Sequence, residues 1–246
     1  MQATNQRING KRLWDSLMEM AAIGATPKGG VRRLALSDVD RAGRDRFRAL
    51  CEAAGLHVRV DAIGNMFARR DGADPSRPPV LFGSHLDSQP SGGKFDGALG
   101  VMAGLEVMRT LDDLGLVTDA PVELVSWTDE EGARFGRSLM GSGVWAGVYD
   151  PAVVEASQDL DGITVGAALD GIGYRGPEPP GPSPPIRISS CISSKARSWS
   201  ARARRSASSP AGRRRCGGTW WRPARTATPA PPRPTPGATP WSAPPG

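Results

Sequence analysis

The sequence predicts an α/β domain with a largely parallel sheet, because segments that alternate or run apolar like strands take turns with segments that repeat like helices. Residues 79–83 and 122–127 are short apolar runs typical of buried strands. Polar and acidic side chains follow both runs directly. Ligands of such sheets gather beyond the carboxyl ends of the strands, so a functional site is expected at this edge.

The first two expected helices have clear boundaries. Leu13, Leu17 and Met20 recur at helical spacing, and this helix ends before Gly24. The next helix opens at Ser37, whose hydroxyl can cap it, with acidic residues in its first turn. It continues through the apolar residues Phe47, Leu50 and Ala54 and ends at Gly55.

The remaining elements form the expected sheet and one more helix. Residues 57–61 and 65–69 alternate like paired strands on either side of a glycine turn. The others follow in the order strand, helix, strand: residues 79–83, 97–111 and 122–127. The pattern stops beyond Asp170.

Composition divides the chain near residue 178. Residues 1–178 hold all 25 acidic residues and 19 Lys or Arg, so this part is mildly acidic. Residues 179–246 contain 12 Lys or Arg but no Asp, Glu, Leu or Val. A segment with so few branched aliphatic side chains cannot offset its chain entropy by burial, so a disordered basic tail is expected. The rival interpretation is an arm that binds nucleic acid or anionic surfaces.

Other features indicate an ordinary cytoplasmic protein without a membrane partner. The three cysteines have neither zinc-finger spacing nor the density of a disulfide scaffold, and Cys51 falls in a helical pattern where a buried thiol is expected. The amino terminus lacks the apolar core of a signal peptide, and no apolar run is long enough to span a membrane.

His85 and Asp87 follow the first buried strand. A single histidine after a strand is more often packed than a ligand. However, residues two apart share a side of an extended chain, so Asp87 can accept one ring N–H and leave the other nitrogen for a metal.

Three more acids complete the candidate site. Asp96 lies in a glycine-flanked turn before a helix, where it can cap the helix, bridge two cations, or do both. Glu130 and Glu131 follow the second buried strand, where a solvated acidic turn is the ordinary explanation. The functional explanation is that one glutamate binds a metal while its neighbour, turned the other way, moves a proton.

Two segments carry a resemblance to a known family. GSHLDSQPSGGKFDGALGV and TDEEGARFGRSLMGSGVWAG resemble the two metal-site motifs of the N-carbamoyl-L-amino-acid amidohydrolases, the hydantoinase/carbamoylase group that includes allantoate amidohydrolase and β-ureidopropionase. The opening INGKRLWDSLMEMAAIGATPKGGVRRLALSDVDR and the run VRVDAIGNMFARR are similar as well. The match covers roughly residues 7–178.

The resemblance implies a layered metallohydrolase fold of the zinc aminopeptidase type and two divalent ions, zinc first, with manganese, cobalt or nickel as alternatives. It implies that His85 binds one ion, Asp96 bridges both and Glu131 binds the other. Glu130 is then the general base and Asp87 supports His85. The implied substrates are small N-carbamoyl or ureido compounds, with no specific nucleic acid, and the intact family members are homodimers.

The chain departs from this family after residue 178. The family completes its site with two further histidines, one of them in a HIEQGP motif, and inserts a dimer-forming domain with a DxHAGxTP-like stretch. This chain has only two histidines, and the second, His57, falls in a strand far from any motif, where a structural role is expected.

A shift of reading frame explains the missing motifs. Permitted codons for residues 189–200 (SSCISSKARSWS), read from the third base, give ELHIEQGPVLE. The same shift across residues 225–241 permits the signature of the dimer domain. A one-base slip near residues 179–183 is therefore expected, which leaves residues 1–178 as a partial catalytic domain and residues 179–246 without evolved function.

The expected function is hydrolysis of linear amide or ureido C–N bonds in the intact relative, with weak metal binding and no turnover in this chain. Two alternatives stay open: a related aminopeptidase or deacylase, and a non-enzymatic remnant with a basic tail. Activity of the repaired gene product on a panel of substrates would distinguish an aminopeptidase or deacylase from the expected enzyme. The number of bound metal ions would distinguish a non-enzymatic remnant from an enzyme.

Overall fold

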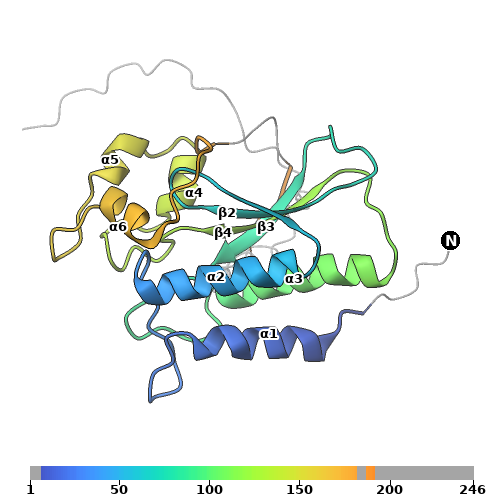
Figure 1. The fold of residues 1–246 in the computed structure, drawn as a ribbon, viewed down its shortest axis with the longest axis horizontal. Helices are drawn as coiled ribbons and strands as arrows, with labels where there is room; N and C mark the ends of the chain where they lie inside the picture. The colour runs from blue at the N-terminus through green and yellow to red at the C-terminus, as the bar shows by residue number, and fades with distance from the viewer. Residues whose placement is uncertain (1–6, 182–186, 192–246) are drawn as a thin grey trace, which may run out of the picture. The chain divides into compact units, whose positions relative to one another are not determined.

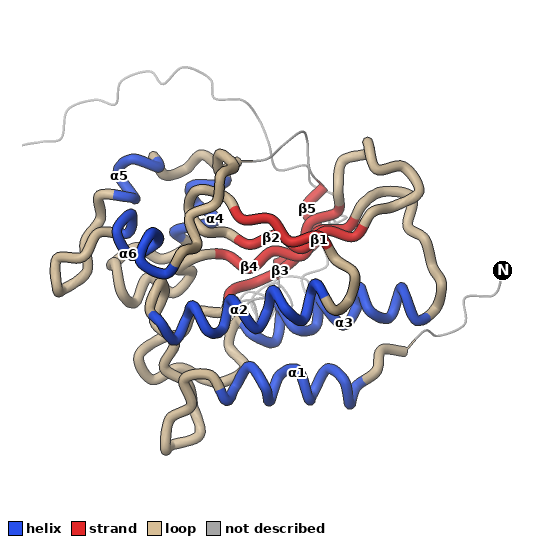
Figure 2. The backbone as a smooth tube through the Cα atoms, in the orientation of Figure 1, coloured by secondary structure: helices blue, strands red, loops and turns tan. Residues whose placement is uncertain are grey.

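The computed structural model describes residues 7–181 and 187–191, and its centre is one five-stranded sheet of order β1-β2-β4-β3-β5 (Figure 2). The strands are β1 His57–Val60, β2 Met66–Arg70, β3 Val80–His85, β4 Val122–Trp127 and β5 Arg187–Cys191. β3 pairs parallel with β4 and β5, whereas β2 pairs antiparallel with β1 and β4. The expected parallel pairing is confirmed for β3 with β4. The expected pairing of β1 with β2 across a glycine turn is also confirmed, and it is antiparallel because the turn is short. The antiparallel pairing of β2 with β4 makes the sheet mixed rather than largely parallel.

Six helices lie in the described part of the chain: α1 Gly10–Ala22, α2 Asp38–Glu52, α3 Ala98–Asp113, α4 Met140–Trp145, α5 Pro151–Glu155 and α6 Val165–Ile172. The three long helices lie on one side of the sheet, and α4, α5 and α6 gather beyond one of its ends (Figure 1). The sequence predicts the long helices. It does not predict the short ones, since helices of five to eight residues give little periodic signal.

The predicted cap and stop of α2 are present, and α1 has a cap that was not predicted from the sequence. Ser37 accepts a hydrogen bond from the Asp40 amide at 3.2 Å and so begins α2, with acids in its first turn. Asn9 caps α1 in the same way, through a 3.0 Å bond from the Arg12 amide. Gly55 ends the second helical segment in the left-handed conformation (φ 70°) that glycine adopts without strain.

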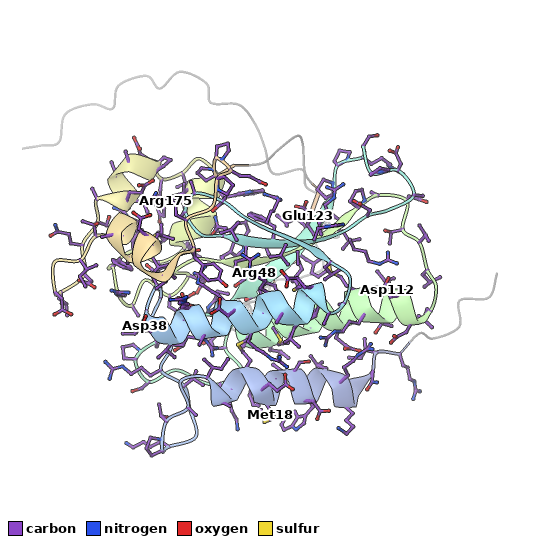
Figure 3. The ribbon with its side chains drawn as sticks, viewed as in Figure 1. Met18, Asp38, Arg48, Asp112, Glu123 and Arg175 are labelled. Carbon is purple, nitrogen blue, oxygen red and sulfur yellow. The ribbon has the colours of Figure 1, made fainter. Side chains whose placement is uncertain are left out.

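The sheet separates two apolar clusters. The larger cluster lies between the sheet and the long helices, and β4 sends Val122 and Leu124 into it. The alternate β4 residues Val125 and Trp127 belong to a second cluster on the opposite face. Glu123 shares that face and accepts bonds from arginines of β1 and β2 at 3.2 and 3.4 Å (Figure 3). All six residues of β4 are buried, as expected for a central strand covered on both faces.

β5 lies inside the segment expected to be disordered. The prediction is wrong for Arg187–Cys191, whose backbone pairs in parallel with the edge of β3 and so satisfies that edge whatever side chains the strand carries. Residues 182–186 and 192–246, and most of the predicted tail with them, lie outside the described residues. The domain boundary near residue 178 stays a prediction. No helix of the described residues is both long enough and apolar enough to cross a membrane.

A buried asparagine ties the β1–β2 turn to the end of β4. The Asn65 side chain is fully buried and accepts a hydrogen bond from the Thr128 amide at 3.0 Å. Its amide group donates to Asp61 at 2.8 Å and to the Gly141 carbonyl at 3.1 Å. One side chain therefore joins three segments that are distant in the sequence.

Substitution Asn65→Ala is expected to lower the free energy of unfolding by about 3 kcal/mol, because it leaves several buried polar groups without partners. Urea denaturation followed by circular dichroism measures this change. Val117→Ala serves as the control, since Val117 is 69% exposed and should change stability by less than about 0.5 kcal/mol. Equal effects of the two substitutions would contradict the assigned role of Asn65.

Candidate metal centre

The candidate site forms where two parallel strands end side by side. β3 ends at His85, which stands in register with Trp127 at the end of β4. The segment from Thr128 to Glu131 follows β4 directly, so its acids meet the histidine at the carboxyl edge of the sheet. This placement is the one that the sequence predicts.

One imidazole and two glutamates come close enough to share a cation. Ligand atoms of His85, Glu130 and Glu131 all lie within 4.8 Å of one another. Their exposed fractions are 1%, 6% and 6%, so the cluster is buried. His85 Nε2 lies 3.4 Å from Glu130 Oε2 and 4.0 Å from Asp96 Oδ1. The structure thus brings His85 together with three of the predicted acids: Asp96, Glu130 and Glu131.

Asp87 is the fifth predicted residue, and it contacts both loops. Its carbonyl oxygen lies 3.0 Å from His85 Nδ1, and its carboxylate lies 3.6 Å from the same nitrogen. The carboxylate also accepts the backbone N–H groups of Glu130 at 3.2 Å and Glu131 at 3.1 Å. With Nδ1 engaged on this side, the Nε2 atom is the one that faces the glutamates.

The sequence suggests that the two glutamates point to opposite sides, but in the structure they do not. Both offer oxygens to the same cluster. The reason is the backbone around them, which is a turn rather than a strand: Asp129 (φ 49°) and Gly132 (φ 65°) are in the left-handed region. Adjacent side chains alternate sides only on an extended chain.

The turn before α3 is shaped by its closeness to His85. Gly97 has φ 66°, and a Cβ atom there would lie 2.5 Å from His85 Cε1 and Nε2. Only glycine fits this position. Gly97 is also the N-cap of α3, without a side-chain cap, so the alternative role of Asp96 as a helix cap is not observed.

Opposing electrostatic effects act on the histidine. Burial by itself lowers the pKa of His85, but the adjacent Asp87 and the charge of Glu130 outweigh it and raise the pKa to about 9. Burial raises the pKa of Asp87, yet the bonds from His85 and from two backbone amides bring that pKa below its usual value. At neutral pH the imidazolium therefore balances part of the negative charge of the acids.

The sequence did not reveal two residues that hold these loops. Arg33 is 1% exposed, and its guanidinium donates to the Leu86 carbonyl at 2.6 Å and to carbonyls of Met20 and Ile23 at 2.9 Å. Asn65 fixes Thr128 as described above. The asparagine follows a glycine in a predicted turn, which was a usable signal. Nothing distinguished Arg33 from the surface arginines around it.

His57 lies apart from this site, as expected. It begins β1, the edge strand that is separated from β3 by two other strands, and its side chain is exposed. Among the described residues it belongs to no cluster of potential metal ligands.

The donor set suits a divalent cation. A neutral imidazole and carboxylates are the ligands that zinc, manganese and cobalt accept, and here they are buried together. A cation would offset the repulsion between the clustered acids and replace the proton of His85. The described residues therefore fit one such ion, with Asp96 beside it.

Comparisons with known proteins show which family this chain resembles. A family model described as peptidase family M28 matches residues 65–213. An N-carbamoyl-L-amino-acid amidohydrolase from Rhizobium meliloti is 51% identical over 174 residues, which are 71% of this chain and 42% of that protein. A ureidoglycolate hydrolase from Arabidopsis thaliana is 34% identical over 163 residues, 66% of this chain and 34% of that protein.

A solved structure is also similar to this chain in sequence and in fold. The crystal structure of a hydantoinase/carbamoylase family amidase from Burkholderia ambifaria is 61% identical, with a TM-score of 0.72 over 72% of this chain and 44% of that chain. The present chain thus spans about two fifths of the length of the amidohydrolase from Rhizobium meliloti and of the amidase from Burkholderia ambifaria.

Asp129 provides a test of the electrostatics of the site. It is fully buried, and burial together with the charges of Asp87 and Asp40 raises its pKa to about 8. An acid with a raised pKa stabilises the fold below its unfolded pKa near 4, and this contribution is lost as the pH rises toward 8.

Substitution Asp129→Asn removes the carboxyl group and therefore the decrease in stability that its ionisation causes as the pH rises. Asparagine tolerates the left-handed backbone equally well. In chelator, the Tm of the variant should exceed that of the unchanged chain by an amount that grows from pH 4 to pH 8. Differential scanning fluorimetry across this range measures the difference, and Asp161→Asn, at an exposed position, is the control. A Tm difference independent of pH would contradict the assignment.

Proposed function

Since the chain belongs to peptidase family M28 and to the hydantoinase/carbamoylase group of amidohydrolases, we propose that it is the first part of a metal-dependent hydrolase of linear amide or ureido C–N bonds. The observation that carries the proposal is the buried cluster of His85, Glu130 and Glu131 at the carboxyl edge of the sheet. Hydrolysis of such a bond needs an activated water and a base, and this cluster offers a cation site with several carboxylates.

The roles proposed for the individual residues are those that the family resemblance implies. His85, Asp96 and Glu131 hold the cations, of which the family resemblance implies two, with zinc first and manganese, cobalt or nickel as alternatives. Such cations would supply Lewis acidity, which lowers the pKa of a water molecule and polarises the carbonyl of the substrate. Glu130 is the proposed general base, which would take a proton from the attacking water and deliver it to the leaving nitrogen. Asp87 holds His85 and the backbone of both glutamates.

The proposed substrates are small N-carbamoyl or ureido compounds. The relatives named for N-carbamoyl amino acids and for ureidoglycolate share the ureido group, which supports this class. Hydrolysis of an N-carbamoyl amino acid would release carbon dioxide, ammonia and the amino acid. A related aminopeptidase or deacylase is the second candidate, favoured by the match to a family described as a peptidase family.

We further propose that this chain is inactive as it stands, because a one-base slip near residue 180 replaced the rest of the hydrolase. The chain has two histidines, and only His85 lies in the site. The register of β5 supports the slip: Cys191 pairs with Gly83 in the parallel ladder. In the shifted frame, the histidine codon of the HIEQGP motif spans residues 191 and 192, so the proposed histidine would belong at the carboxyl end of β5, whose last residue is Cys191.

The remaining proposals concern the intact relative. It would be a cytoplasmic homodimer whose dimer-forming domain is lost here, without specific nucleic-acid or membrane partners. A non-enzymatic remnant with a basic tail is the alternative for this chain, and its metal content separates the two.

Repair of the frame is expected to restore turnover of N-carbamoyl amino acids, while the present chain shows none. Ammonia release from a panel of N-carbamoyl amino acids, ureidoglycolate, allantoate and dipeptides measures this, and it also identifies the substrate class. In the repaired enzyme, Glu130→Gln should lower kcat at least about a hundredfold while the metal content stays unchanged. Hydrolysis by the present chain at ordinary enzyme rates would refute its proposed inactivity.

The present chain is expected to bind a divalent cation weakly through His85. His85→Asn should abolish the visible absorption that Co²⁺ gains on binding, because it removes the nitrogen ligand of the cluster. His57→Asn is the matched control, since that histidine is exposed on an edge strand. The proposed centre fails if both variants bind Co²⁺ as the unchanged chain does.

A further inference from the structure

The loop after β3 is anchored on both sides of its tip. Ser88 donates its backbone N–H to the Arg33 carbonyl at 2.8 Å, and its hydroxyl oxygen accepts the Arg33 amide at 2.9 Å. Further along, Gly92 and Val31 exchange two backbone hydrogen bonds of 3.0 Å. The residues between these anchors are therefore held at a defined place beside the site.

Gln89 stands on this tip and reaches back to a member of the cluster. Although the residue is exposed, its Nε2 atom lies 2.8 Å from Glu131 Oε2. A carboxylate only accepts hydrogen bonds, so the partner atom must be the amide nitrogen, which fixes the orientation of the Gln89 amide. The position thus contacts solvent on one side and a buried acid on the other.

The backbone of Glu131 is held separately from its side chain. Its N–H donates to Asp87 at 3.1 Å, and its carbonyl accepts the Ser138 hydroxyl at 3.2 Å. Neither bond fixes the rotation of the long glutamate side chain. The bond from Gln89 does, because it holds one carboxylate oxygen directly.

We propose that Gln89 is a positioning residue that aims the Glu131 carboxylate at the cation, and this inference rests on the proposed metal centre. The chemistry of the donor supports the role. A glutamine donates without a positive charge, so Glu131 keeps its full attraction for a cation, whereas lysine or arginine would compete with the ion. Outer partners that orient metal ligands in this way commonly change metal affinity by tenfold or more when removed.

The test is a Co²⁺ titration of the full chain followed by visible absorption. Gln89→Met keeps the length of the side chain but removes the donor, and it should raise the Kd for Co²⁺ about tenfold. Gln89→Lys should raise the Kd for Co²⁺ further, because the positively charged ammonium group would compete with the cation for the Glu131 carboxylate. Ser91→Ala, at an exposed position on the same loop, should leave the Kd unchanged.

Stability separates a positioning role from a structural one. The Tm of all variants in chelator should equal that of the unchanged chain, because Gln89 is exposed and its loop is anchored by other residues. Co²⁺ binding that Gln89→Met leaves unchanged overturns this inference alone, and so does a loss of affinity that only follows a lower Tm. Failure of the unchanged chain to bind Co²⁺ overturns the metal centre and this inference together.

Discussion

The carboxylate of Asp87 accepts the backbone N–H groups of two consecutive glutamates, and the geometry of the candidate site depends on this contact. Asp87 follows β3, whereas the glutamates follow β4, so one buried side chain joins the ends of neighbouring parallel strands. Charge-assisted bonds to backbone amides are stronger than neutral ones and are directional. These bonds fix the backbone positions of Glu130 and Glu131. The contact of Asp87 with His85 Nδ1 fixes the orientation of the imidazole ring.

Burial of so many acids requires compensating charges and dipoles. Within the described part of the chain, the buried guanidinium of Arg33 holds the Leu86 carbonyl, and the buried pair of Arg44 and Asp40, 2.8 Å apart, braces α2. Arg44 also donates to the Gly64 carbonyl at 2.7 Å, beside Asn65. The polar network therefore runs behind the site from α2 to the ends of β3 and β4. Loss of one member would leave its buried partners without hydrogen bonds, which is costly. The intact network is therefore rigid.

The number of nitrogen ligands among the described residues bears on how firmly the site can hold a cation. The described residues place one imidazole among three acids: Glu130, Glu131 and Asp96. Fewer nitrogen ligands mean weaker binding and less control over the geometry of a cation. The hydrogen bonds from Asp87 to the backbone of both glutamates, and those from Arg33 to Leu86 and from Thr128 to Asn65, all lie within residues 31–141.

The sequence by itself determined the alternation of strands and helices, the capped start of α2, and the residues that meet at the sheet edge. These features follow from local periodicity and from the rule that parallel strands end together. Only the tertiary structure decided the antiparallel pairing of β2 with β4, the orientation of the two glutamates, and the contact of Gln89 with Glu131. It also revealed that Arg33 is buried. Each of these depends on contacts between segments that are distant in the chain or on single left-handed residues, and neither leaves a periodic pattern in the sequence.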